Sequence, residues 1–121
     1  MVVDDSDTFL KVTCSVLDLD DVIDLVAAAG NGVEAIDTVA RLKPALILMD
    51  VHMPGLDGLA TASLLTRMAP APAVVLMSSD DTPGLRAACL RAGAFDFVHK
   101  ENFRSEFETV LRRLLQAQMN S

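Results

Sequence analysis

The sequence places polar side chains that could bind a metal ion or carry a phosphoryl group directly after short apolar runs. Asp4 and Asp5 follow the first run, Asp50 ends the run Leu-Ile-Leu-Met, Ser78 ends another, and Lys100 follows the last. Carboxylates gathered in one place repel one another and favour a hard divalent cation such as Mg²⁺. A carboxylate beside Mg²⁺ and a lysine could act as a nucleophile toward phosphorus, because the two cations neutralise charge on the phosphoryl oxygens.

These side chains meet only if the apolar runs end at one place in the fold. Short apolar runs alternate with amphipathic segments along the chain, which predicts an α/β fold with a doubly wound parallel sheet. In such a sheet the carboxyl ends of the strands share one edge, where ligands bind. The predicted strands are residues 2–3, 22–28, 45–49, 73–77 and 95–98. The predicted helices are residues 8–17, 32–42, 59–68, 83–92 and 103–118.

The first predicted strand is short. Only Met1, Val2 and Val3 precede Asp4, whereas a central strand usually has about five or six residues. The strand is therefore either truncated or unusually short, and we favour truncation.

Composition narrows the class of protein. With 121 residues and 51% hydrophobic residues, we expect one domain over residues 1–121. The net charge of −7 argues against direct binding to nucleic acid. The start does not resemble a signal peptide, and no stretch approaches the roughly 20 apolar residues of a membrane span, so we expect a cytoplasmic protein without membrane contact. Cys14 and Cys89 lack metal-site spacing and are interpreted as reduced core residues.

Each polar residue also has a purely structural interpretation. Asp5 or Ser6 could cap the following helix, and Asp50 could form an Asx turn. Ser78 could simply begin a loop, and His52 could be an exposed loop residue. Phe97 could be a core aromatic residue, and Lys100 a surface lysine. The coincidence of these residue types at four strand ends favours the functional interpretation.

Four motifs give the chain a family resemblance over nearly its whole length. They are VVDDS at 2–6, LILMDVHMPGLDG at 46–58, VVLMSSDD at 74–81 and AGAFDFVHK at 92–100. With them the chain resembles a receiver domain of two-component response regulators, the CheY-like group. The resemblance implies a flavodoxin-like five-stranded sheet with strand order 2-1-3-4-5. It also implies a phosphorylation switch rather than an enzyme, with only self-phosphorylation and slow autodephosphorylation.

The resemblance assigns the acidic residues to phosphoryl and metal binding. Asp50 would be the phosphoacceptor, charged by a histidine kinase or a histidine phosphotransfer protein. Mg²⁺ would be held by Asp5, Asp50 and the main-chain carbonyl of His52, with Asp4 acting mostly through metal-bound water.

The resemblance also implies how the signal would leave the site. Ser78 would be the switch hydroxyl, Lys100 would pair with the phosphoryl group, and the Phe97 ring would move inward with the hydroxyl. The surface of the fourth helix, fifth strand and fifth helix would then bind a downstream protein target or output domain, or form a homodimer.

Two departures from the family pattern, the short first strand and the residue after Lys100, stand beside this interpretation, and so do two alternative functions. Glu101 follows Lys100 where the family usually has a proline with a cis peptide, so the geometry of that loop is open. His52 and Asp80 match positions that tune acyl-phosphate lifetime in the family. One alternative function is a Mg²⁺-dependent aspartyl-phosphate phosphatase, although His52 stands where such enzymes place their second acid. The other is a receiver-like interaction module that is never phosphorylated.

Overall fold

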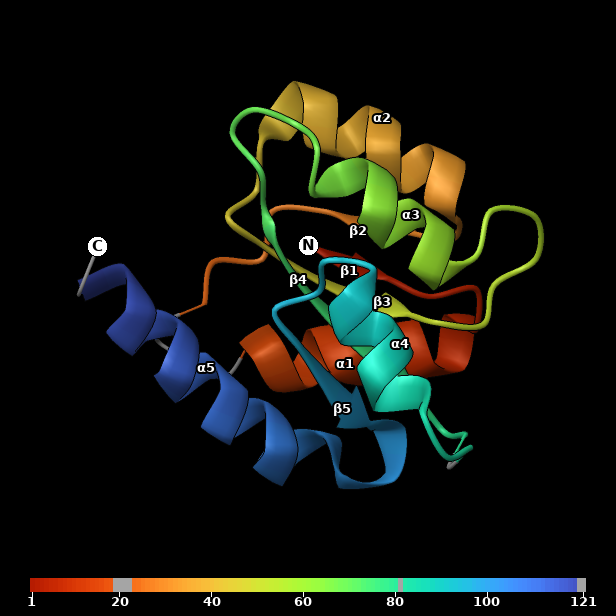
Figure 1. Cartoon of the computed structure of the whole chain (residues 1–121), viewed down its shortest axis with the longest axis vertical. Helices are drawn as coiled ribbons and strands as arrows, with labels where there is room; N and C mark the ends of the chain where they lie inside the picture. Colours follow the sequence, from red (N-terminus) through yellow and green to blue (C-terminus); the bar gives the residue numbers. More distant parts are fainter. Residues whose placement is uncertain (19–22, 81, 120–121) are drawn as a thin grey trace.

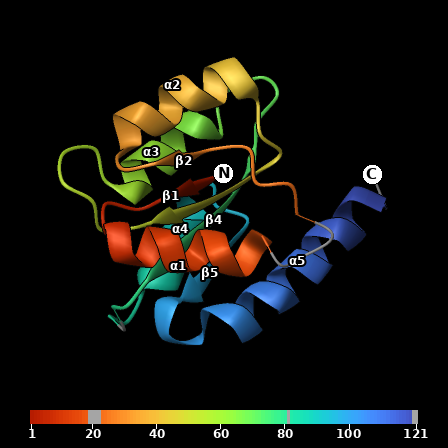
Figure 2. The same cartoon turned by 180° about the vertical axis from the view of Figure 1, so that it is seen from behind.

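The computed structural model describes residues 1–18, 23–80 and 82–119 and consists of a parallel sheet between two layers of helices (Figures 1 and 2). The strands are β1 (Val2–Val3), β2 (Ala28–Ala29), β3 (Leu46–Asp50), β4 (Ala73–Ser78) and β5 (Asp96–His99). The helices are α1 (Asp7–Asp18), α2 (Gly32–Leu42), α3 (Gly58–Leu65), α4 (Leu85–Arg91), the 3₁₀ turn η1 (Lys100–Asn102) and α5 (Phe103–Met119). The strand order β2-β1-β3-β4-β5 confirms the predicted sheet.

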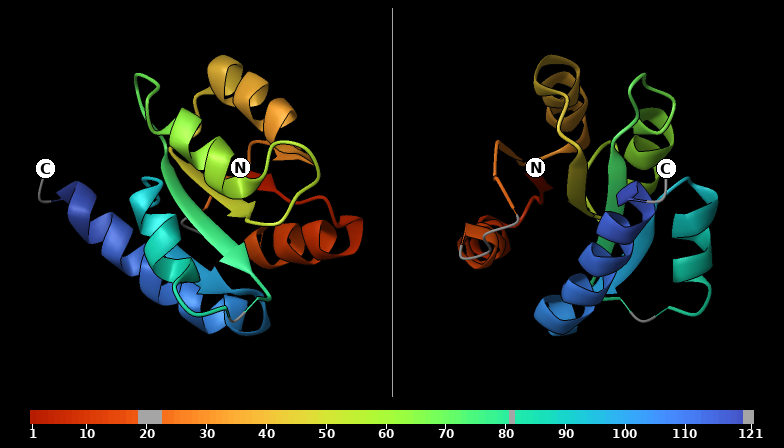
Figure 3. Two further views of the ribbon diagram at one scale, coloured as in Figure 1. Left: turned by 45° about the vertical axis from the view of Figure 1, so that its right-hand side comes forward. Right: turned by 90° about the vertical axis from the view of Figure 1, so that its left-hand side faces the viewer.

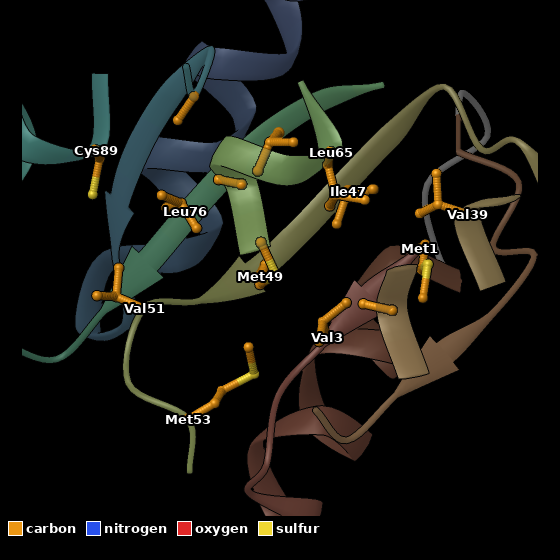
Figure 4. Close-up of a cluster of buried hydrophobic side chains, with 14 of the residues drawn as sticks. Met1, Val3, Val39, Ile47, Met49, Val51, Met53, Leu65, Leu76 and Cys89 are labelled. Carbon is orange, nitrogen blue, oxygen red and sulfur yellow. The ribbon is translucent and has the colours of Figure 1, made fainter. Parts of the chain in front are cut away.

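The two central strands are apolar because both of their faces are buried. Successive side chains of a strand point to opposite faces. Met49 and Leu76 therefore pack into the core under α2, α3 and α4 (Figure 4), whereas Leu48 and Met77 pack into the core under α1 and α5. This division separates α1 and α5 on one face of the sheet from the other three helices.

The strand register brings the polar strand ends together. Val3 pairs with Met49, so Asp4 and Asp50 follow on neighbouring strands. Ser78 pairs with His99 at the end of β4 and β5, which places Lys100 one residue beyond that pair. Because all these strands are parallel, their carboxyl ends share one edge, and the arrowheads of β3 and β4 point the same way in Figure 3.

The predicted second strand, residues 22–28, is wrong in its extent. The observed β2 is only Ala28–Ala29, and Val22 lies outside the described residues. A strand needs a hydrogen-bonded neighbour, and β1 pairs only Val2 with Ala28 and Val3 with Ala29. Residues 23–27 have no β1 residue opposite them, although Ile23 and Leu25 still turn toward the core under α1 and α5.

Helix boundaries agree with the predictions to within a few residues and are set by local capping. The side chain of Asn31 accepts a hydrogen bond from the Glu34 N–H at 2.8 Å, and the side chain of Asp57 accepts one from the Ala60 N–H at 2.8 Å. Both residues are side-chain N-caps, a role that short oxygen-bearing side chains fill well. α3 ends at Leu65, three residues before the predicted end.

Two further expectations concern the membrane and the cysteines. None of the helices in the described parts of the chain combines the length and the apolar character that a bilayer crossing requires. Cys14 is half-buried and Cys89 is buried, and both thiols are free. Burial raises the pKa of Cys89 to about 11, which keeps this thiol protonated and unreactive.

Candidate functional site

Three carboxylates meet at the carboxyl edge of the sheet. One oxygen each from Asp4, Asp5 and Asp50 lies within 4.8 Å of the others. Asp4 is 0% exposed and Asp50 is 6% exposed, whereas Asp5 faces solvent. The cluster therefore has two buried members and one open to the outside.

The loop after β1 holds Asp4 in place and leaves Asp5 available. Asp4 Oδ1 accepts a hydrogen bond from the Ser6 N–H at 2.9 Å. Ser6 Oγ accepts one from the Phe9 N–H at 3.3 Å, so Ser6 caps α1. Of the two candidate caps, Ser6 therefore takes this role, and the side chain of Asp5 belongs to the acidic cluster.

Asp50 forms the Asx turn considered for it and also faces Lys100. Its Oδ1 accepts a hydrogen bond from the His52 N–H at 3.2 Å, which is an Asx turn. Its backbone runs against the start of α3, where a Cβ on Gly58 would lie 2.2 Å from the Asp50 carbonyl oxygen. The turn and this close approach fix the strand end, while Asp50 Oδ2 is directed to Lys100.

Lys100 is not a surface lysine. Its Nζ lies 2.8 Å from Asp4 Oδ2 and 3.1 Å from Asp50 Oδ2, and its side chain is 12% exposed. Among the described residues the one cis peptide precedes Pro70, so the Lys100–Glu101 peptide is trans. Lys100 instead begins the 3₁₀ turn η1, and its side chain still reaches the carboxylates.

The charges in the cluster shift one another's titration. Burial raises the pKa of Asp50 above its ordinary value; Lys100 opposes this rise through its charge and hydrogen bond, and Asp4 adds to it. For Lys100, burial alone would lower the pKa, but the hydrogen bonds and negative charges of Asp4 and Asp50 outweigh it and raise the pKa. Lys100 is consequently a firmly held cation at neutral pH.

The acidic cluster has the donor set of a hard divalent cation. Asp4 Oδ2 is buried and pairs with Lys100 Nζ at 2.8 Å. Lys100 carries a single positive charge against three carboxylates, and a divalent cation would balance the remaining charge. Three clustered carboxylates, one of them solvent-facing, fit an ion such as Mg²⁺ that keeps several water ligands.

Ser78 ends β4, and Phe97 lies within the neighbouring strand β5. Ser78 is fully buried, and its Oγ accepts a hydrogen bond from the Asp80 N–H at 2.9 Å. Phe97 is 2% exposed, so its ring lies inside the molecule. The ring centroid is 5.0 Å from that of His99 in an edge-to-face arrangement.

His52 lies at the mouth of the site rather than in the acidic cluster. Its ring is exposed, and Nε2 lies 3.3 Å from Asp80 Oδ2. The pair spans the loops after β3 and β4. A role for the His52 carbonyl in metal binding stays a prediction.

Two features of this region were not predicted from the sequence. The first is the contact of Lys100 Nζ with the face of the Phe9 ring, 4.2 Å from its centroid. The second is Asp96, a buried acid on β5 that accepts hydrogen bonds from Arg86 on α4, at 2.7 Å, and from Arg113 on α5. A charged residue inside the apolar run 95–98 was a signal for such a partner, because a buried carboxylate needs one.

With the geometry described, comparison with known proteins decides the family. Residues 1–112 match the family model described as the response regulator receiver domain. The chain belongs to this family. The sequence match and the strand order therefore agree. The acidic cluster and Lys100 belong to a receiver domain.

Relatives of established class are longer than this chain. A protein-glutamate methylesterase/protein-glutamine glutaminase of Methanococcoides burtonii is 34% identical over 95% of this chain, and the match covers 33% of that protein. One from Geobacter metallireducens is 44% identical over 83% of this chain and 28% of that protein. The chain thus spans about a third of the length of such relatives.

Solved receiver domains share the fold over almost all of the chain. The response regulator domain of Thermotoga maritima CheB has a TM-score of 0.82 and 32% identity, covering 99% of this chain and 94% of that one. The receiver domain of the NarL regulator of Mycobacterium tuberculosis has a TM-score of 0.82 and 28% identity over the same shares.

Proposed function

We propose that residues 1–121 form one receiver domain that acts in the cytoplasm and accepts a phosphoryl group on Asp50. The donor is the phosphohistidine of a histidine kinase or a histidine phosphotransfer protein. The observation that best supports this proposal is Lys100 Nζ lying 2.8 Å from Asp4 and 3.1 Å from Asp50 at a buried strand edge. This arrangement places a fixed cation beside a rigidly held carboxylate, as phosphoryl transfer requires.

The chemistry follows from the residues of the cluster. An oxygen of Asp50 forms the new bond to phosphorus while the bond from phosphorus to the donor histidine breaks and its electron pair stays on the ring nitrogen. Lys100 pairs with a phosphoryl oxygen. Asp4, Asp5, Asp50 and the His52 carbonyl would hold Mg²⁺, which supplies further neutralisation of the phosphoryl charge when bound.

The output follows from Ser78 and the elements beside it. Ser78 Oγ, which now accepts from the Asp80 N–H, would donate to the phosphoryl group. The Phe97 ring, which is buried in this structure, would move with the hydroxyl. The α4–β5–α5 surface would then shift its population toward a form that binds a partner.

The partner is a downstream protein or an output domain, and a homodimer through the α4–β5–α5 surface is a further candidate. The matched relatives carry methylesterase/glutaminase names and are about three times as long as the chain, which favours an output domain of that class. With a net charge of −7, the chain itself is not suited to contact nucleic acid.

The test is uptake of phosphate from acetyl phosphate, followed by intact mass. We expect an adduct on the wild type with Mg²⁺, none after chelation of Mg²⁺, and none on Asp50→Asn. As a matched control, Asp37→Asn changes an exposed acid of α2 that pairs with Arg41, and it should keep the adduct.

Three results would contradict the proposal. An adduct on Asp50→Asn would move the acceptor to another residue. A wild type that takes no phosphate would indicate an interaction module that is not phosphorylated. Steady turnover of an external phosphomonoester would indicate a phosphatase.

A further inference from the structure

The ammonium group of Lys100 has three contacts, and only two of them are with charged groups. Its Nζ contacts the carboxylates of Asp4 and Asp50, and it also lies over the ring face of Phe9, 4.2 Å from the centroid. The face of an aromatic ring carries partial negative charge and attracts an ammonium group, most strongly where the pair is shielded from water. The third contact is thus between the Lys100 cation and an uncharged ring.

The Phe9 ring is itself fixed by packing. It meets the Phe103 ring edge to face, with centroids 6.4 Å apart and an angle of 81°. Phe103 in turn stacks on Phe107 at 5.3 Å. The first turn of α1 and the first turns of α5 therefore hold the ring in one orientation, directly beneath Lys100.

This neutral contact differs from the two carboxylates in what happens during the reaction. In the proposed function, Asp50 becomes bonded to phosphorus and Lys100 pairs with a phosphoryl oxygen, so the charged partners of Lys100 change during transfer. The ring neither titrates nor forms bonds, and it does not compete with a phosphoryl oxygen for the ammonium protons. It can hold Lys100 before and after transfer.

We propose that Phe9 is a positioning residue that holds the Lys100 ammonium at the phosphoryl site in a chain where Lys100 is followed by a trans peptide and a 3₁₀ turn. This inference rests on the proposed function. The competing interpretation is that Phe9 is only a packing residue between α1 and α5, and the two make different predictions.

The first experiment looks at the contact itself and needs no phosphorylation. The chain has three lysines, Lys11, Lys43 and Lys100, so lysine-selective ¹³C labelling gives a simple NMR spectrum. We expect the Lys100 side-chain protons to be shifted upfield by the ring and to move toward the Lys11 and Lys43 positions in Phe9→Leu. An unshifted Lys100 signal in the wild type would overturn the inference.

The second experiment measures the rate of adduct formation from acetyl phosphate at saturating Mg²⁺. Phe9→Leu should slow it by about threefold to tenfold, the size expected for one partly shielded cation–π contact. Phe9→Tyr, which keeps the ring, should restore the rate to within about twofold. Phe95→Leu is the matched control, because it removes a ring that packs on the same core but whose cation contact is with Arg113 rather than Lys100.

A double-mutant cycle separates positioning from packing. In a Lys100→Ala background, Phe9→Leu should slow adduct formation no further. An equal loss in that background, or an equal loss in Phe95→Leu, would overturn the inference. A wild type that forms no adduct would sink the proposed function instead, and the NMR measurement would still decide whether the ring holds Lys100.

Discussion

At the scale of single residues, Asp50 is a carboxylate held in an environment that resists its charge. Burial raises its pKa above the ordinary 3.8, Asp4 raises it further, and Lys100 offsets only part of the rise. The folded state therefore binds a proton at Asp50 more tightly than the unfolded chain does. Its contribution to stability is present below pH 3.8 and is lost as pH rises through the raised pKa of the folded state.

Replacing this carboxylate is expected to stabilise the protein. In metal-free buffer, Asp50→Asn should raise the free energy of unfolding at pH 7, and the gain should shrink as the pH falls through the raised pKa of Asp50, where the wild type takes up a proton. Urea unfolding from pH 4 to pH 8 measures this difference. A gain that is the same at every pH, or a loss at pH 7, would contradict the assignment of Asp50 as a destabilised acid.

At the scale of elements, the junction of β3 and α3 determines where Asp50 lies. The Gly58 N–H donates to the Val51 carbonyl at 2.8 Å, and a Cβ at Gly58 would approach the Asp50 carbonyl oxygen to 2.2 Å. Both atoms it would meet first are backbone, which cannot rotate aside as a side chain can. The helix packs this closely on the strand end only because the residue is glycine.

Gly58→Ala should accordingly disturb the site and the fold together. We expect a loss of about 2 kcal/mol in the free energy of unfolding, typical of an overpacked interior, and slower phosphorylation of Asp50. Gly30→Ala is the control, since a Cβ there meets nothing within 4 Å, and it should change stability by less than about 0.5 kcal/mol. Equal effects of the two substitutions would contradict the importance of this contact.

The helices and strands also show which parts of the fold could be predicted from the sequence. Central strands β3 and β4 were predicted nearly to the residue, because burial on both faces makes them apolar throughout. The length of β2 was not predicted correctly, because it depends on the length of its neighbour β1 rather than on the residues of β2 itself. At the site, Asp4, Asp50 and Lys100 follow from the strand ends, whereas the contact of Phe9 with Lys100 joins opposite ends of the chain and leaves no local pattern.

At the scale of the whole molecule, an acidic chain gathers three of its carboxylates at one place. Lys100 offsets part of their repulsion through its ion pairs with Asp4 and Asp50. At the start of β5, Asp96 joins α4 to α5 through Arg86 and Arg113. The proposed output surface is thus tied together by one buried acid, close to the ring of Phe97 over which Arg86 lies.

Adding Mg²⁺ should stabilise the whole fold. A ligand that binds only the folded state at ten times its Kd contributes about 1.4 kcal/mol. Thermal unfolding followed by circular dichroism is the suitable measurement, because the chain has no Trp or Tyr. We expect a higher Tm with Mg²⁺ than with NaCl of equal ionic strength, and a smaller difference in Asp50→Asn. Equal shifts with the two salts would argue against a cation site.

The central claim is that Asp50 becomes the phosphorylated residue, and chemical trapping tests it most directly. Borohydride reduces an acyl phosphate to an alcohol, so a phosphorylated aspartate becomes homoserine and can be located by peptide sequencing. After treatment with acetyl phosphate and Mg²⁺, we predict homoserine at position 50, with Asp4 and Asp5 unchanged. Homoserine at another aspartate, with Asp50 intact, would contradict the account.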